Sequence, residues 1–161
     1  VFSFPLKHRI FCTGFLFREK PLPRNIDKYK LEKLEISLAD ILLLKAGHDV
    51  VNKNGVLVKN EEATFDPPPP RAYAYCSDTV FDPEVIDYVR GVDLLYHEST
   101  FLDDNAERAA KTFHSTARQA ATIARDAGVG QLLLGHYSAR YGDIQGFLKE
   151  AGEVFVNSLL A

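Results

Sequence analysis

The chain has 161 residues, a length that fits one domain, and 46% of them are apolar, which is enough for a sizeable core. Its 19 Lys and Arg against 22 Asp and Glu exclude a protein that coats nucleic acid non-specifically, but not a nucleic-acid enzyme with clustered basic groups. Two cysteines are too few for a disulfide framework, and no stretch approaches the length of a membrane span. We therefore expect free thiols and no membrane partner.

The first part of the chain predicts two strands and then a polar segment that leaves the core. Segments 1–5 and 10–17 are apolar and aromatic, as in strands, and His8 lies in their connection. Segment 18–35 is charged, contains two prolines and carries a modest excess of Lys and Arg. Such a stretch is most often a solvated loop, although as a protruding arm it could grip a polyanion through phosphate contacts.

The middle of the chain predicts short elements. Ser37 is suited to cap a helix that reaches Lys45 and ends at Gly47. Residues 52–55 form a hairpin-type turn between two valine-rich segments, and the four prolines at 67–70 form a rigid connector. Lys45 could contact a phosphate, but an exposed lysine at a helix end needs no such explanation.

Strands and helices alternate from residue 72 onward, which predicts an α/β fold. The expected strands span 72–76, 92–96, 131–135 and 154–156, and the expected helices span 83–90, 105–113, 115–127 and 144–151. Polar residues follow three of the strands: Asp78, Glu98 and His136. Because parallel strands bring their carboxyl ends together, these side chains should meet.

Each of these residues has a functional and a structural interpretation. Asp78 is equally suited to a functional role, as a metal ligand or a general base, and to capping a helix. A lone histidine such as His136 is more often structural, but its place beside the other two strand ends favours a metal ligand. Adjacent residues of a strand point to opposite faces, so only one of His97 and Glu98 can face a given cleft. We favour a structural His97 with a backbone partner and a Glu98 that orients a catalytic histidine.

His114 precedes a predicted helix start. The positive helix end should keep its basicity low and could attract a phosphate, or His114 could simply be bonded locally at the start of the helix. Ser115 and Thr116 would serve as caps in either case. Arg140 could contact phosphate or support the scaffold.

Five segments together make a more specific pattern. They are Pro5-Leu6-Lys7-His8 leading into Thr13-Gly14-Phe15; Ser77-Asp78-Thr79; His97-Glu98-Ser99-Thr100-Phe101; His114-Ser115-Thr116 with Gln119-Ala120-Ala121; and Gly135-His136-Tyr137-Ser138-Ala139-Arg140-Tyr141. In order and spacing they resemble ribonuclease Z, the tRNA 3′-processing endonuclease family of the metallo-β-lactamase fold. The resemblance runs through nearly the whole chain.

This resemblance implies a metallo-β-lactamase-like αββα sandwich, of which residues 1–161 are the C-terminal half, with an inserted arm within 18–70. It implies a cytoplasmic, homodimeric enzyme that uses two zinc ions to cleave precursor tRNA. The implied metal ligands are His8, Asp78 and His136, with Asp78 bridging. The implied proton donor is His114, oriented by Glu98. The implied substrate-binding residues are Lys45, Arg140, Ser115 and Thr116.

The chain departs from the family pattern in two places. The His-x-His-x-Asp-His motif, which supplies most metal ligands, is absent, and so is a Gly-Pro pair before Lys45. We therefore expect a fragment with weak metal binding, negligible activity on its own and an exposed apolar sheet face. The alternatives are a small-phosphodiester hydrolase of the same fold and a non-catalytic RNA-binding or dimerisation module.

Overall fold

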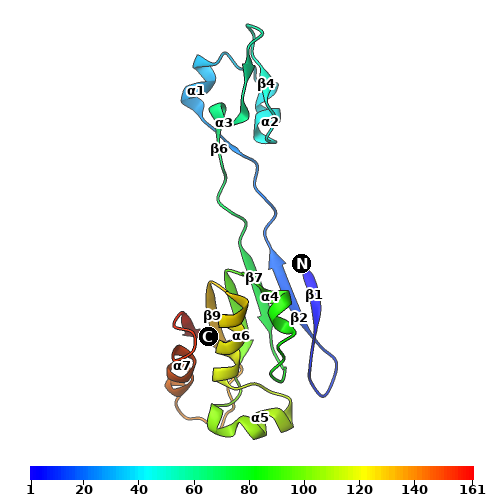
Figure 1. The fold of residues 1–161 in the computed structure, drawn as a ribbon, viewed down its shortest axis with the longest axis vertical. Helices are drawn as coiled ribbons and strands as arrows, with labels where there is room; N and C mark the ends of the chain where they lie inside the picture. The colour runs from blue at the N-terminus through cyan, green and yellow to red at the C-terminus, as the bar shows by residue number, and fades with distance from the viewer. The chain divides into compact units, whose positions relative to one another are not determined.

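The computed structural model describes all 161 residues, and its contacts divide the chain into two compact units (Figure 1). The first unit comprises Val1–Glu19 and Arg71–Ala161, and the second comprises Lys20–Pro70. None of the helices combines the length and the apolar character that crossing a bilayer requires.

The first unit is built on a six-stranded sheet with the order β1-β2-β7-β8-β9-β10. The strands are β1 (Phe2–Leu6), β2 (Cys12–Arg18), β7 (Ala72–Cys76), β8 (Leu94–Glu98), β9 (Gln131–Gly135) and β10 (Ser158–Leu160). Strands β1, β2 and β7 pair antiparallel, whereas β7, β8, β9 and β10 pair parallel. The carboxyl ends of β7, β8 and β9 therefore lie at one edge, with Glu98 opposite Gly135.

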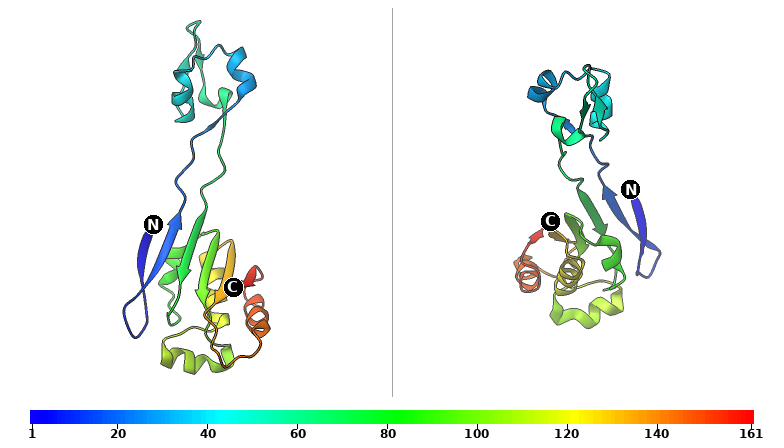
Figure 2. Two further views of the ribbon diagram at one scale, coloured as in Figure 1. Left: turned by 180° about the vertical axis from the view of Figure 1, so that it is seen from behind. Right: turned by 45° about the horizontal axis from the view of Figure 1, so that its top comes forward.

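Helices follow the parallel strands. They are α4 (Val85–Val89), the 3₁₀ turn η1 (Asp103–Asn105), α5 (Ala106–Thr112), α6 (Ala117–Ala127) and α7 (Gln145–Gly152). The longest, α6, begins with a capping box between Thr116 and Gln119 and ends at Gly128, whose φ of 63° is left-handed. Its alanine-rich face packs on the sheet together with α4, and the view from behind shows the sheet in front of these helices (Figure 2).

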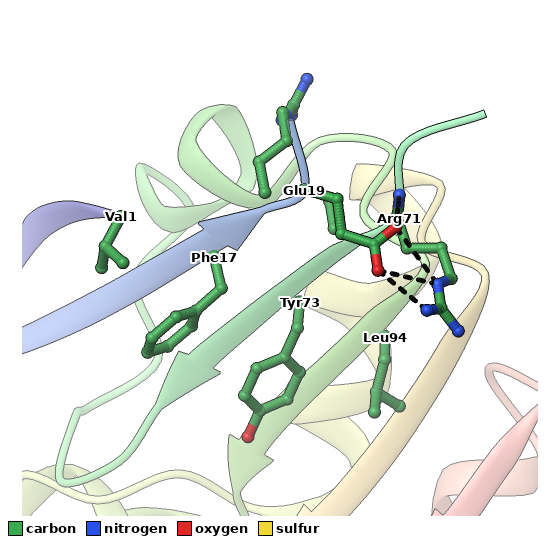
Figure 3. Close-up of a pocket in the computed structure, with 8 residues that line it drawn as sticks. Val1, Phe17, Glu19, Arg71, Tyr73 and Leu94 are labelled. Atoms are coloured by element: carbon green, nitrogen blue, oxygen red, sulfur yellow. Dashed lines mark hydrogen bonds and ion pairs between the residues drawn. The ribbon is translucent and has the colours of Figure 1, made fainter. Parts of the chain in front are cut away.

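The opposite face of the sheet is apolar and uncovered, as the sequence predicts. Phe15 and Phe17 remain 39% and 43% exposed, although apolar side chains of this size are usually buried. Aromatic pairs line this face, with ring centroids 5.8 Å apart for Phe17 and Tyr73 and 4.7 Å apart for Tyr75 and Tyr96. Figure 3 shows one end of this face, where Phe17, Tyr73 and Leu94 lie side by side near the Glu19–Arg71 ion pair.

The second unit has a core of its own, formed by Leu44, Val50, Val58 and Ala63. Its elements are β3 (Asn25–Ile26), α1 (Lys28–Lys33), α2 (Asp40–Lys45), β4 (Val50–Val51), β5 (Leu57–Val58), α3 (Asn60–Ala63) and β6 (Thr64–Phe65). The buried side chain of Asn60 links α3 to the end of α2 and the loop after it, because its Nδ2 donates to the carbonyl oxygens of Leu44 and His48. The segment that the sequence places outside the main core therefore folds around a small core of its own.

Three element predictions need correction. The predicted strand 154–156 is wrong, because the backbone N–H groups of Val154 and Phe155 donate to the carbonyl oxygen of Ala151, and β10 begins only at Ser158. Strand β8 runs two residues further than predicted, since His97 and Glu98 still pair with β9. Ser37 is not the N-cap of α2, which begins at Asp40 with Ala39 as its N-cap; the Ser37 hydroxyl oxygen instead accepts the N–H of Asp40 in the preceding turn.

Candidate active site

A buried carboxylate lies at the centre of the site. Glu98 is 0% exposed at the end of β8 and accepts five hydrogen bonds. Its Oε1 accepts from the Thr79 amide at 3.0 Å and from His114 Nδ1 at 2.7 Å. Its Oε2 accepts from the Thr100 amide at 3.1 Å, the Thr100 hydroxyl at 2.7 Å and the Ser115 amide at 3.2 Å. A buried charge needs such partners, and here three loops supply them.

The hydrogen bond between Glu98 and His114 shifts both groups toward their charged forms. Burial alone would raise the pKa of Glu98, but the hydrogen bonds from His114 and Thr100 outweigh it and hold the pKa below its usual value. The same hydrogen bond raises the pKa of His114, although burial opposes it. The prediction that the α6 terminus keeps His114 weakly basic is therefore wrong in direction, because the imidazole faces a carboxylate and precedes the cap of α6 by two residues.

We expect the free energy of unfolding of the metal-free chain to fall on both sides of a pH maximum, once toward acid and once toward alkaline pH. The depressed pKa of Glu98 contributes stability above its ordinary value of 4.5, which is lost as the pH falls through the folded-state pKa. The raised pKa of His114 contributes stability that is complete below its ordinary 6.5 and is lost as the pH rises through the folded-state pKa. Urea denaturation should thus show highest stability between the two values.

The substitution Glu98→Gln should weaken the pH dependence of stability on both the acid and the alkaline side, because Glu98 and His114 share one hydrogen bond. A profile with the same shape in the variant and the parent chain would contradict this assignment.

The three histidines near this carboxylate each engage their Nδ1 atom in a hydrogen bond. Nδ1 of His8 lies 2.8 Å from the Phe113 carbonyl oxygen, Nδ1 of His114 bonds Glu98, and Nδ1 of His136 lies 2.9 Å from the Thr100 hydroxyl. The ring of His114 lies between the other two, at centroid distances of 5.1 Å and 5.3 Å. Engaging Nδ1 leaves Nε2 available, as in histidines that bind metals through Nε2.

Asp78 completes this cluster from the end of β7. Its Oδ1 lies 3.3 Å from Nε2 of His136, and two ligands about 2.1 Å from a tetrahedral zinc ion lie about 3.4 Å apart. Two sets of possible ligand atoms lie within 4.8 Å of one another: His8, Asp78 and His114 in one, and Glu98, His114 and His136 in the other. The donor types and spacing therefore fit a divalent metal.

The backbone is strained at two of these residues. Asp78 and His136 have φ values of 58° and 61°, in the left-handed region that is costly for residues other than glycine. Both follow the last residue of a parallel strand closely, so the chain turns sharply there. These turns direct both side chains toward the same point at the edge of the sheet.

His97 occupies the other face of β8. It is 1% exposed, and its Nδ1 donates to the carbonyl oxygen of Glu98 at 2.7 Å. Burial lowers the pKa of His97 and favours a neutral ring. The prediction of a structural histidine with a backbone partner is confirmed.

The predicted substrate-binding residues lie in different surroundings. Ser115 and Thr116 are fully buried; the Ser115 hydroxyl donates to the Thr79 carbonyl at 2.8 Å, and Thr116 caps α6. Their hydroxyls therefore shape the site from within the fold. Arg140 is exposed, with its guanidinium 5.7 Å from the Phe101 ring centroid, and Lys45 belongs to the second unit.

Sequence reasoning did not assign a role to Thr100 or Thr79. Thr100 lies within the run His97–Phe101 that the sequence singles out, but its hydroxyl role depends on neighbours 36 residues away in the chain. Thr79 contributes a backbone amide, which any residue would offer.

The architecture has counterparts among known proteins. A family model described as a beta-lactamase superfamily domain matches residues 64–137. The metallo-beta-lactamase fold protein YhfI from Bacillus subtilis superposes over 98% of this chain and 44% of its own, with a TM-score of 0.60 and 18% identity. Human tRNase Z, short form, superposes over 99% of this chain and 39% of its own, with a TM-score of 0.52 and 21% identity. The fold is that of part of a metallo-β-lactamase domain.

The comparison of sequences points to one family within this fold. The chain is 48% identical over 161 residues to ribonuclease Z of Porphyromonas gingivalis and 49% identical to that of Cytophaga hutchinsonii. It spans about half the length of these curated relatives, 53% and 51% respectively. The predicted resemblance to ribonuclease Z is confirmed along the whole chain.

Proposed function

We propose that this chain supplies part of the active site of a ribonuclease Z-type, metal-dependent endonuclease that removes 3′ trailers from precursor tRNA. The observation that carries the proposal is that Asp78 lies close to both His8 and His136, beside the buried Glu98–His114 pair. The similarity to ribonuclease Z over all 161 residues supports the substrate class.

His8, Asp78 and His136 are the proposed metal ligands, and zinc is the proposed metal because it favours imidazole nitrogen and carboxylate oxygen. When bound, a divalent ion there would supply Lewis-acid stabilisation of charge on the scissile phosphate. Three ligands shared between two ions leave each ion under-coordinated, since a catalytic zinc takes about three protein ligands. Weak metal binding and negligible activity are therefore proposed for this chain alone.

His114 is the proposed proton donor to the leaving oxygen. Among the three histidines at the site, it is the one whose Nδ1 bonds a carboxylate, and this partner raises its pKa. A protonated imidazole carries a hydrogen on Nε2 and can give it to a leaving group, but it cannot bind a metal. His8 and His136 bond neutral oxygens through Nδ1, which suits them to the ligand role instead.

The remaining assignments follow from the resemblance. Arg140 is exposed beside the site and is proposed to contact a tRNA phosphate. Lys45 and the exposed lysines of α1 are proposed to contact the tRNA backbone from the second unit. We propose a homodimeric, cytoplasmic enzyme for the complete protein.

A chimera tests the function. These 161 residues would replace the matching residues of the Porphyromonas gingivalis relative, and the purified chimera would be assayed on precursor tRNA with zinc. We expect cleavage at the 3′ side, and a loss of about 10²–10⁴-fold in rate for His114→Ala if it is the general acid. His48→Ala, which removes an exposed histidine of the second unit, is the matched control.

Two outcomes would contradict the proposal. A chimera that hydrolyses a small chromogenic phosphodiester but leaves precursor tRNA intact would favour the general hydrolase. Equal rates for His114→Ala and His48→Ala would remove His114 from the chemistry.

A further inference from the structure

The hydroxyl of Thr100 lies between the buried carboxylate and a proposed metal ligand. Its Oγ1 is 2.7 Å from Glu98 Oε2 and 2.9 Å from His136 Nδ1. Thr100 is 7% exposed, so water has little access to replace either contact. One hydroxyl group thus touches both the residue that orients His114 and the residue proposed to bind metal.

The direction of these two hydrogen bonds follows from the groups involved. The Glu98 carboxylate accepts three backbone N–H groups, and an ionised carboxylate can only accept. The single hydroxyl hydrogen of Thr100 is therefore donated to Glu98. Its oxygen can then only accept from His136, so the hydrogen of a neutral His136 ring resides on Nδ1.

The other ring nitrogen of His136 is the one that faces Asp78. With Nδ1 carrying the hydrogen, Nε2 presents a lone pair 3.3 Å from Asp78 Oδ1. Two acceptors at this distance repel each other unless a cation lies between them. Without the Thr100 oxygen, the ring would gain by moving its hydrogen to Nε2 and donating it to Asp78, which would occupy the ligand atom.

We propose that Thr100 is a positioning residue that fixes His136 in the tautomer with a bare Nε2. Through the shared carboxylate of Glu98, the same hydroxyl links the metal ligand to the orientation of His114. Its backbone contributes as well, since the Thr100 carbonyl accepts the N–H of Ser138 at 3.1 Å and so holds the loop that carries His136. The inference rests on the proposed ligand role of His136.

Nitrogen-15 NMR of the metal-free 161-residue chain, labelled at histidine, tests this directly. The two ring nitrogens differ strongly in chemical shift according to which carries hydrogen, and the spectrum is taken at a pH where imidazole is neutral. We expect His136 in the parent chain to carry its hydrogen on Nδ1. A hydrogen on Nε2 in the parent chain would overturn the proposal without any variant.

Three variants sharpen the test. Thr100→Val keeps the shape but removes the hydroxyl, so His136 should shift to the Nε2–H tautomer. Thr100→Ser keeps the hydroxyl and should retain the parent tautomer. Ser99→Ala is the matched control, because it removes a neighbouring buried hydroxyl that bonds the Gly135 carbonyl rather than an imidazole. An unchanged tautomer in Thr100→Val, or the same shift in Ser99→Ala, would overturn the proposal.

Zinc affinity, measured by calorimetry on the same variants, separates this inference from the proposed function. Loss of a group that orients a metal-binding histidine typically costs about 10–100-fold in affinity, and Thr100→Val should lose that much while Thr100→Ser loses far less. If Thr100→Val binds zinc like the parent chain while Asp78→Ala does not, the inference fails and the metal site stands. If the tautomer shifts as expected but Asp78→Ala changes nothing, the metal site fails and the tautomer assignment stands.

Discussion

Glu98→Gln will lower the free energy of unfolding of the metal-free chain by about 2–4 kcal/mol, because removing the charge leaves buried donors without an acceptor. A glutamine amide keeps the size of the side chain but turns one oxygen into an NH₂ group. Whichever way the amide lies, its NH₂ faces either the Thr79 amide and His114 or the amides of Thr100 and Ser115. Urea denaturation at neutral pH measures the difference.

The matched control for this substitution is Glu107→Gln. Glu107 is exposed on α5, and its Oε2 lies 3.7 Å from Nζ of Lys111, which makes a weak surface ion pair. Its replacement should therefore change the free energy of unfolding by no more than about 0.5 kcal/mol. Equal effects of the two substitutions would show that the five contacts of Glu98 add little to the stability of the fold.

Asp78→Ala will reduce the zinc affinity of the chain by about 100-fold or more, which corresponds to about 2.7 kcal/mol. Asp78 is the carboxylate that lies near both His8 and His136, so its loss removes the bridging position of the proposed site. Folding should be little affected, since the side chain is 40% exposed and its φ of 58° is strained for alanine as well as for aspartate. Calorimetric titration with zinc measures the change.

Asp104→Ala is the control for non-specific binding, because Asp104 is an exposed carboxylate of η1 outside the cluster. A similar loss of affinity in Asp104→Ala would indicate diffuse binding to acidic groups. Unchanged affinity in Asp78→Ala would exclude Asp78 as a ligand.

Much of the fold is readable from local patterns. The predicted strand 72–76 and the strand 131–135 agree with β7 and β9, since short apolar runs between turn residues are strong strand signals. The cap at Thr116 and the stop at Gly128 are equally local, because both depend on side chains within one turn of the helix. Residues 154–156 are apolar, which predicts a strand, but the backbone N–H groups of Val154 and Phe155 bond the carbonyl oxygen of Ala151 at the end of α7, so no strand forms there.

The site is readable only in part. That polar residues follow the parallel strands, and that His97 and Glu98 point to opposite faces, both follow from strand geometry. The choice of Glu98 as the partner of His114 also needed the resemblance to ribonuclease Z. The basicity of His114 does not follow from its place before α6, because a carboxylate 16 residues earlier in the chain outweighs the helix end. Expectations drawn from neighbours in the sequence fail where a residue distant in the sequence makes the closer contact in space.

The sequence by itself determined the order of the elements, the likeness to ribonuclease Z and the set of residues from which the site is drawn. Those features depend on residue types and spacings, which the chain carries in any conformation. Only the tertiary structure decided which nitrogen of each histidine at the site is engaged and how the Thr100 hydroxyl joins Glu98 to His136. These features depend on distances of 3 Å or less between loops far apart in sequence, and such distances are set by the packing of the whole unit.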